Sequence, residues 1–204
     1  MIAHDQLIQP RSTSMKYDPD KHHRRSIRLS GYDYSQPGAY FVTICAYQRQ
    51  CIFGEIIDGQ MRLNQYGAIV AETYQWLCQH YSYLHTDEWI VMPNHFHAIM
   101  IITDKPSPSD SHCRGGSRTA PTTNSQNPII KQKPLGRLIG AFKTVSTKKI
   151  NILRDAPGTK LWQRNYYEHI IRNQNAMDKI HEYIVYNPLS WHLDQLHPDN
   201  PSKW

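Results

Sequence analysis

The sequence lacks the usual marks of a secreted, membrane-spanning or zinc-ribbon protein. It has only four cysteines, and none of them forms a Cys-x-x-Cys pair. This spacing argues against a zinc ribbon or a redox motif and favours reduced cysteines in a cytosolic protein. No run approaches the ~20 apolar residues that a membrane-spanning helix needs, and residues 1–26 hold no apolar core of signal-peptide length. We therefore expect a cytoplasmic protein with no membrane partner.

The sequence also has no strong excess of charge of either sign. Lysine and arginine number 23 against 17 acidic residues, which gives a net charge of +6 over 204 residues. This excess favours an anionic partner such as nucleic acid but is too small to establish one. The chain is rich in aromatic residues, with 13 tyrosines and five tryptophans. Such rings fill cores, and they also stack on unpaired bases.

The hydrophobic pattern predicts an α+β chain. Alternating or apolar runs predict strands, and apolar residues at helical spacing predict helices. We expect strands at 40–47, 52–57, 61–63, in two parts of 87–102 divided at Pro93, and at 161–171, with helices at 65–79, 135–150 and 175–187. Without the small hairpin at 52–63 the order is βαββαβ. This order predicts a ferredoxin-like antiparallel sheet with helices on one face, to which a C-terminal helix is added.

Composition divides the chain into a domain and its appendages. Residues 1–26 are polar and end in a basic cluster, so we expect a flexible N-terminal arm. Residues 103–134 are rich in Ser, Thr, Pro and Gly and predict a flexible insert. The domain itself is expected over 27–192, and 193–204 would be a C-terminal tail.

A histidine pair is the most informative local feature. His95 and His97 flank Phe96 in an apolar run that predicts a strand, so both imidazoles should lie on one face. Two neighbouring imidazoles can bind a divalent metal, although alternate histidines can also serve packing. Mg²⁺ or Mn²⁺ would need an oxygen ligand as well, which the side chain of Asn187 could supply.

A tyrosine near the C-terminus completes the pattern. Tyr183 and Asn187 lie four residues apart in a predicted helix, which puts both on one helical face. A tyrosine beside a metal can attack a phosphate and hold the nucleic acid end covalently. Tyr186 and the 166–167 pair are rivals for this role, but only Tyr183 has an amide four residues later.

At these residues the chain resembles a known family. Asn-His-Phe-His-Ala-Ile at 94–99, followed by Tyr-Ile-Val-Tyr-Asn-Pro at 183–188, is similar to the REP-associated tyrosine transposases. These belong to the single-tyrosine branch of the HUH endonucleases. Segments 24–35 and 162–173 also resemble stretches that are usual in such proteins. The resemblance implies that His95, His97 and Asn187 hold Mg²⁺ or Mn²⁺ and that Tyr183 is the nucleophile.

The resemblance also implies an activity and a partner. We expect a metal-dependent endonuclease and transposase that cleaves and rejoins single-stranded DNA near hairpins through a 5′-phosphotyrosine intermediate. Its partner would be single-stranded DNA with hairpins, and both a homodimer and a monomer stay open. The basic side chains that we predict to contact DNA phosphates are Arg24, Arg25, Arg28, Lys143, Lys148 and Lys149.

Three alternatives stay open at this point. A catalytically inactive, domesticated DNA- or RNA-binding module would keep the fold without the chemistry. A relaxase or replication-initiator nickase shares the chemistry but usually belongs to a larger chain. A histidine-triad nucleotide hydrolase would want a third alternating histidine, where this chain has Ile99.

Overall fold

The computed structural model describes residue 29 and the ranges 31–104 and 132–200. The predicted arm, with Arg24, Arg25 and Arg28, lies outside the described residues. So does the 105–131 part of the predicted insert.

Four strands form the central sheet, and all neighbouring pairs are antiparallel. The strands are β1 (Gly38–Cys45), β4 (Leu84–Val91), β5 (His95–Ile102) and β6 (Tyr167–Ile171). Their spatial order is β4-β5-β1-β6, so the first strand lies between the third and the fourth of the set. This is the arrangement that a βαββαβ chain adopts in a ferredoxin-like fold, and the predicted fold class is confirmed.

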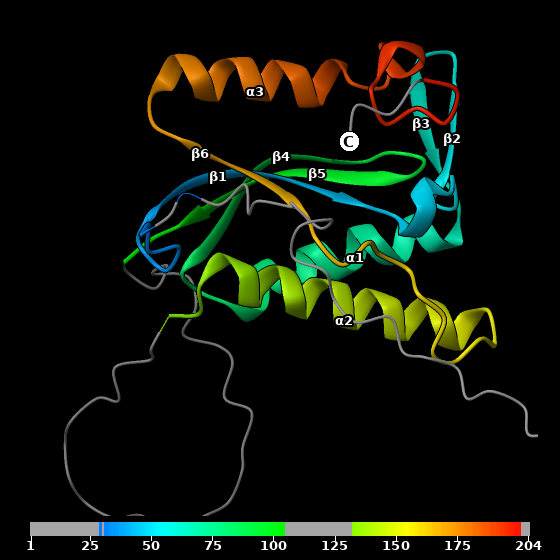
Figure 1. Ribbon diagram of the computed structural model, residues 1–204, viewed down its shortest axis with the longest axis horizontal. Coiled ribbons are helices and arrows are strands. Elements are labelled where there is room, and N and C mark those ends of the chain that lie inside the picture. Colours follow the sequence, from blue (N-terminus) through cyan, green and yellow to red (C-terminus); the bar gives the residue numbers. More distant parts are fainter. Residues whose placement is uncertain (1–28, 30, 105–131, 201–204) are drawn as a thin grey trace, which may run out of the picture.

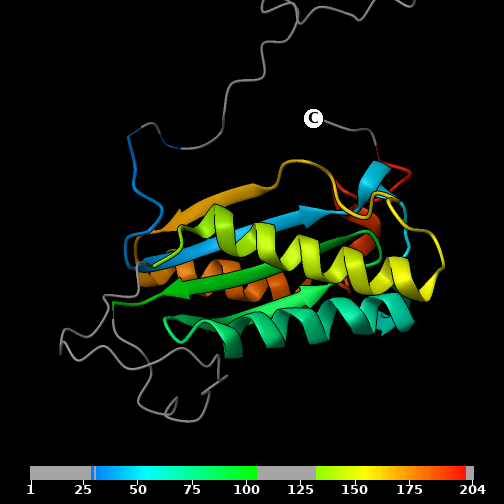
Figure 2. The ribbon, with the colours of Figure 1, turned by 90° about the horizontal axis from the view of Figure 1, so that it is seen from below.

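Helices cover both faces of this sheet. The helices α1 (Gln65–His80) and α2 (Leu135–Leu153) pack together against one face, and α3 (Gln174–Tyr186) crosses the other face over β4 and β5 (Figures 1 and 2). The added C-terminal helix therefore has a face of the sheet to itself. Within the described ranges, no helix has the length and apolar character that crossing a membrane requires.

The alternation of side chains along β1 explains the two layers. Tyr40, Val42 and Ile44 are buried in the large core beneath α1 and α2. Phe41 points to the other face and joins a small apolar cluster with Ile184 of α3. A strand buried on both faces in this way separates a structural core from a second, smaller interface that holds α3.

The structure contains the predicted small hairpin but differs from the prediction at the start of the last strand. The predicted hairpin forms from β2 (Gly54–Ile57) and β3 (Gln60–Leu63). The last strand, however, begins at Tyr167 and not at 161, so that part of the prediction is wrong. Trp162 makes only an isolated bridge to Ala46, and its indole Nε1 donates a hydrogen bond of 2.9 Å to Ser146 Oγ on α2. The apolar residues there serve the core and not the sheet.

Two helical glycines give a direct test of the packing between the hairpin and α1. A Cβ on Gly67 would overlap the main-chain oxygen of Phe53, whereas a Cβ on Gly140 of α2 would meet no atom within 4 Å. We expect Gly67→Ala to lower the free energy of unfolding by about 1–3 kcal/mol through overpacking. Gly140→Ala should raise it by about 0.5–1 kcal/mol, because alanine is the better helix former. Urea denaturation of both variants measures the difference, and equal effects would contradict the close approach at Gly67.

Candidate active site

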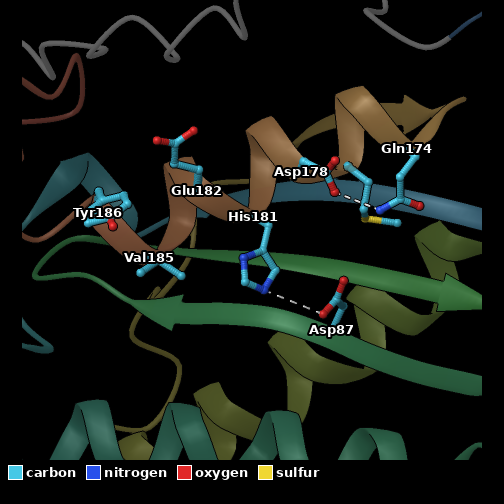
Figure 3. A pocket seen from close by; sticks show the side chains of 8 residues that line it. Asp87, Gln174, Asp178, His181, Glu182, Val185 and Tyr186 are labelled. Carbon is cyan, nitrogen blue, oxygen red and sulfur yellow. Dashed lines mark hydrogen bonds and ion pairs between the residues drawn. The ribbon is translucent and has the colours of Figure 1, made fainter.

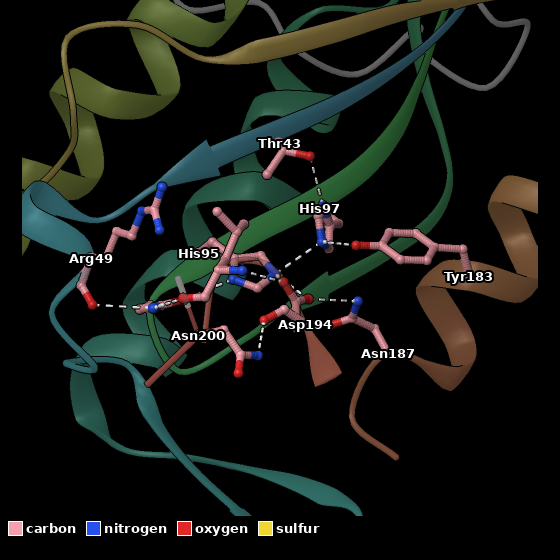
Figure 4. A network of polar contacts seen from close by, with 10 residues as sticks. Thr43, Arg49, His95, His97, Tyr183, Asn187, Asp194 and Asn200 are labelled. Carbon is pink, nitrogen blue, oxygen red and sulfur yellow. Dashed lines mark hydrogen bonds and ion pairs between the residues drawn. The ribbon is translucent and has the colours of Figure 1, made fainter. Parts of the chain in front are cut away.

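The two histidines lie side by side on β5, on the face of the sheet that α3 covers (Figure 4). Both are buried, and their Nε2 atoms are 2.9 Å apart. Period-2 geometry brings both rings to this face, as the sequence pattern predicts. The strand β1 pairs with β5 here, and it places Thr43 directly opposite His97.

The other nitrogen of each imidazole has a fixed partner. His97 Nδ1 is 2.8 Å from Thr43 Oγ1, and His95 Nδ1 is 2.8 Å from Asn94 Oδ1. Burial lowers the pKa of His95 to about 3, and burial together with the neighbouring His95 holds the pKa of His97 well below its usual value. Both rings are therefore neutral at neutral pH, which is the form that ligates metals.

Tyr183 reaches this pair from α3. Its phenolic oxygen is 3.3 Å from His97 Nε2, and Phe41 packs against both rings. The residue is 46% exposed, although its phenolic oxygen lies beside the buried histidine. Burial and the negative charge of Asp194 together raise the pKa of Tyr183 to about 12, although a hydrogen bond from Asn187 acts in the opposite direction. The phenol is thus a poor nucleophile unless a cation lies beside it.

Asn187 lies where α3 ends, and its amide faces the same site. Its Nδ2 donates a hydrogen bond of 3.1 Å to Asp194 Oδ2. Its Oδ1 is buried and has no hydrogen-bond partner in the part of the chain that the structure describes. Leaving a buried acceptor unpaired costs free energy, so this oxygen is available to a metal ion or to a hydrogen-bond donor.

Asp194 is a site residue that the sequence did not reveal. It follows the short 3-10 helix η2 (Trp191–Leu193), and its Oδ2 is 3.9 Å from His95 Nε2. One ligand atom from each of His95, His97 and Asp194 lies within 4.8 Å of the others. The residue belongs to the segment predicted as a C-terminal tail, which through residue 200 packs against the domain. No periodicity or motif around Asp194 signals this role.

These donors fit a divalent metal of the kind that the sequence predicts. The site offers two imidazole nitrogens, one carboxylate and one unpaired amide oxygen, all buried or nearly so. Mixed nitrogen and oxygen ligands suit Mn²⁺, and the oxygen donors suit Mg²⁺. The second partners of the histidines, Thr43 and Asn94, orient both rings toward the common centre.

An acidic groove runs along the other side of α3. Figure 3 shows Asp87, Asp178 and Glu182 around this groove, with His181 reaching from α3 toward β4. His181 Nε2 is 3.4 Å from Glu88 and 4.0 Å from Asp87, which helps to hold α3 on the edge of the sheet. The three carboxylates make this side of α3 negatively charged.

The basic residues predicted on α2 do not lie at this site. Lys143, Lys148 and Lys149 belong to a helix on the opposite face of the sheet (Figure 1). Lys143 Nζ donates hydrogen bonds to the main-chain oxygens of Gln163 (2.9 Å) and Asn165 (3.0 Å). Burial lowers its pKa to about 8. Lys143 therefore ties α2 to the segment before β6, and only Lys148 and Lys149 stay exposed for the predicted phosphate contact.

Comparison with known proteins agrees with this fold. No family model matches the chain. The solved structure of a REP-associated tyrosine transposase bound to a REP hairpin superposes with a TM-score of 0.51 and 15% identity, covering 88% of this chain and 90% of that one. An uncharacterized protein of Haemophilus influenzae is 36% identical over 184 residues, which are 90% of this chain and 98% of that protein.

The structural similarity defines the class of fold. The fold is that of a REP-associated tyrosine transposase, as the sequence motifs implied. The chain belongs to the same family as the Haemophilus influenzae protein, with which it shares nearly its whole length.

Proposed function

We propose that this protein is a metal-dependent endonuclease and transposase that cleaves and rejoins single-stranded DNA through Tyr183. The observation that carries the proposal is the convergence of two distant segments, β5 and the end of α3, on one buried centre. The phenol of Tyr183 lies 3.3 Å from His97, whose Nε2 lies 2.9 Å from that of His95. The unpaired Oδ1 of Asn187 lies in the same site. Structural histidines would not need such a set of donors around them.

The chemistry follows from the groups present. His95 and His97, with oxygen from Asn187 or Asp194, would hold Mg²⁺ or Mn²⁺, which supplies positive charge to the scissile phosphate and to the phenolate. Tyr183 gives up its phenolic proton to solvent and attacks the phosphorus, so a bond forms between its oxygen and the 5′-phosphate. The bond to the 3′ oxygen breaks, and that oxygen leaves as a free 3′-hydroxyl after taking up a proton. Attack by a 3′-hydroxyl on the phosphotyrosine reverses these steps and rejoins the strands.

The surroundings of Tyr183 favour single-stranded DNA as the substrate. The solved transposase with this fold is bound to a REP hairpin, and we extend this partner to the present chain. Tyr183 and Tyr186 are both about half exposed, which leaves rings available for stacking on unpaired bases.

A covalent-adduct assay tests the proposal. Labelled single strands that carry a REP hairpin with single-stranded flanks are incubated with Mg²⁺ or Mn²⁺, and the products are separated on a denaturing gel. We expect a slowly migrating protein–DNA band that needs both the metal and a single-stranded cleavage site. Duplex DNA of the same sequence serves as the control. DNA binding without any adduct would favour the alternative, an inactive binding module of the same fold.

A further inference from the structure

Asn94 lies in the turn between β4 and β5 and is fully buried. Its Nδ2 donates hydrogen bonds to two main-chain oxygens, those of Arg49 at 3.1 Å and of Leu196 at 2.7 Å. A carbonyl oxygen can only accept, so both bonds require the NH₂ group of the amide. The orientation of the Asn94 amide is therefore fixed by the main chain on two sides.

This orientation determines the state of His95. With the NH₂ group committed, Asn94 turns its Oδ1 toward His95 Nδ1 at 2.8 Å. Because Oδ1 can only accept, His95 Nδ1 must carry the proton. A neutral imidazole protonated at Nδ1 presents a lone pair at Nε2, and this is the atom that faces His97 and Asp194.

Thr43 does not impose such an order on His97. A hydroxyl can donate or accept, so the 2.8 Å contact between Thr43 Oγ1 and His97 Nδ1 is compatible with either tautomer. Only one of the two histidines is therefore fixed by its second partner before any ligand binds.

The same amide also connects His95 to the segment of Asp194. Leu196 accepts a hydrogen bond from Asn94 through its carbonyl, while its own N–H donates to Asp194 Oδ1. One side chain thus joins a predicted metal ligand on β5 to a carboxylate that lies 100 residues later in the sequence. Asn200 holds the same segment independently, because its Nδ2 donates to the main-chain oxygens of His192 and Asp194.

We propose that Asn94 is a positioning residue of the metal site: it holds His95 in the Nδ1-protonated tautomer and anchors the Asp194 segment beside it. The effect of Asn94 on metal binding rests on the proposed function, because it supposes that the site binds a metal. The effect of Asn94 on the tautomer of His95 concerns the metal-free protein and is tested independently of the proposed function. The sequence motif Asn-His-Phe-His then has a physical reason for its first residue.

Two substitutions separate the roles. Asn94→Ala removes both the acceptor for His95 and the anchor for Leu196, whereas Asn200→Ala loosens the same segment without touching His95. The tautomer of His95 is measured by ¹⁵N chemical shifts of the imidazole in metal-free protein, and the affinity for Mn²⁺ by electron paramagnetic resonance. We expect Asn94→Ala to lose the Nδ1-protonated form and about 10–100-fold in Mn²⁺ affinity, as for other outer-shell partners of metal ligands. Asn200→Ala should keep the tautomer.

A variant of the same shape separates the acceptor role of Asn94 from its donor role, and circular dichroism shows whether each variant is folded. Asn94→Asp keeps an acceptor for His95 but has no donor for Leu196, so it should preserve the tautomer and still weaken Mn²⁺ binding. The proposal is overturned if the tautomer is unchanged in Asn94→Ala, or altered in Asn94→Asp, or if Asn94→Ala binds Mn²⁺ as wild type does. If wild-type protein itself binds no Mn²⁺, the proposed function fails, while the tautomer measurement still decides the role of Asn94.

Discussion

Replacement of Tyr183 by phenylalanine is expected to abolish the covalent protein–DNA adduct. The phenol oxygen is the atom that lies 3.3 Å from His97 Nε2, and phenylalanine removes that atom while keeping the ring that packs on Phe41. We expect at least about a thousandfold loss of adduct, since a missing nucleophile leaves no covalent route. Binding of the single strand should change little, because the ring and its neighbours remain. The adduct gel and a binding titration measure the two quantities on the same protein.

Tyr186→Phe is the matched control for this experiment. Tyr186 lies on the same helix and is 53% exposed. In the part of the chain that the structure describes, its phenol makes no contact with the histidine pair. Its variant should form the adduct at a rate close to wild type. An adduct that survives Tyr183→Phe and disappears in Tyr186→Phe would mean that Tyr186, and not Tyr183, is the nucleophile. Loss of the adduct in both variants would point to a role of the phenols in binding.

Replacement of Asp194 by asparagine is expected to weaken metal binding strongly. The carboxylate is the only acidic group within ligand distance of His95 and His97 among the residues that the structure describes. Removal of a residue that only supports a metal ligand typically lowers metal affinity about 10–100-fold, so loss of the charge of a ligand itself should lower it about 100-fold or more. Titration of Mn²⁺ by calorimetry measures the affinity, and the adduct assay at saturating Mn²⁺ measures what activity remains.

Asn187→Ala distinguishes the two oxygen donors. If the unpaired Oδ1 of Asn187 is the third ligand, as the sequence predicts, this variant should lose as much affinity as Asp194→Asn. If Asp194 is the ligand, Asn187→Ala should lose less, because it removes only a hydrogen bond of 3.1 Å to the carboxylate. Unchanged affinity in both variants would remove the oxygen side of the proposed site.

Sequence reasoning was most successful where local geometry decides the outcome. Strand periodicity brought His95 and His97 to one face, and helical spacing aligned Tyr183 with Asn187. The element order also predicted the sheet, since βαββαβ chains have few ways to pair their strands. The start of β6 was misplaced because Leu161 and Trp162 are apolar for the sake of the core, which a strand pattern does not distinguish.

The sequence alone determined the class of fold, the histidine pair and the tyrosine helix, because each depends on spacings of a few residues. Only the tertiary structure decided which other groups surround them. Asp194 and Asn94 meet at the site through contacts between segments about 100 residues apart in the sequence. Lys143 is not available to a phosphate, because its ammonium group donates hydrogen bonds to main-chain oxygens. Such long-range contacts are fixed by packing of the whole chain, and no local pattern in the sequence encodes them.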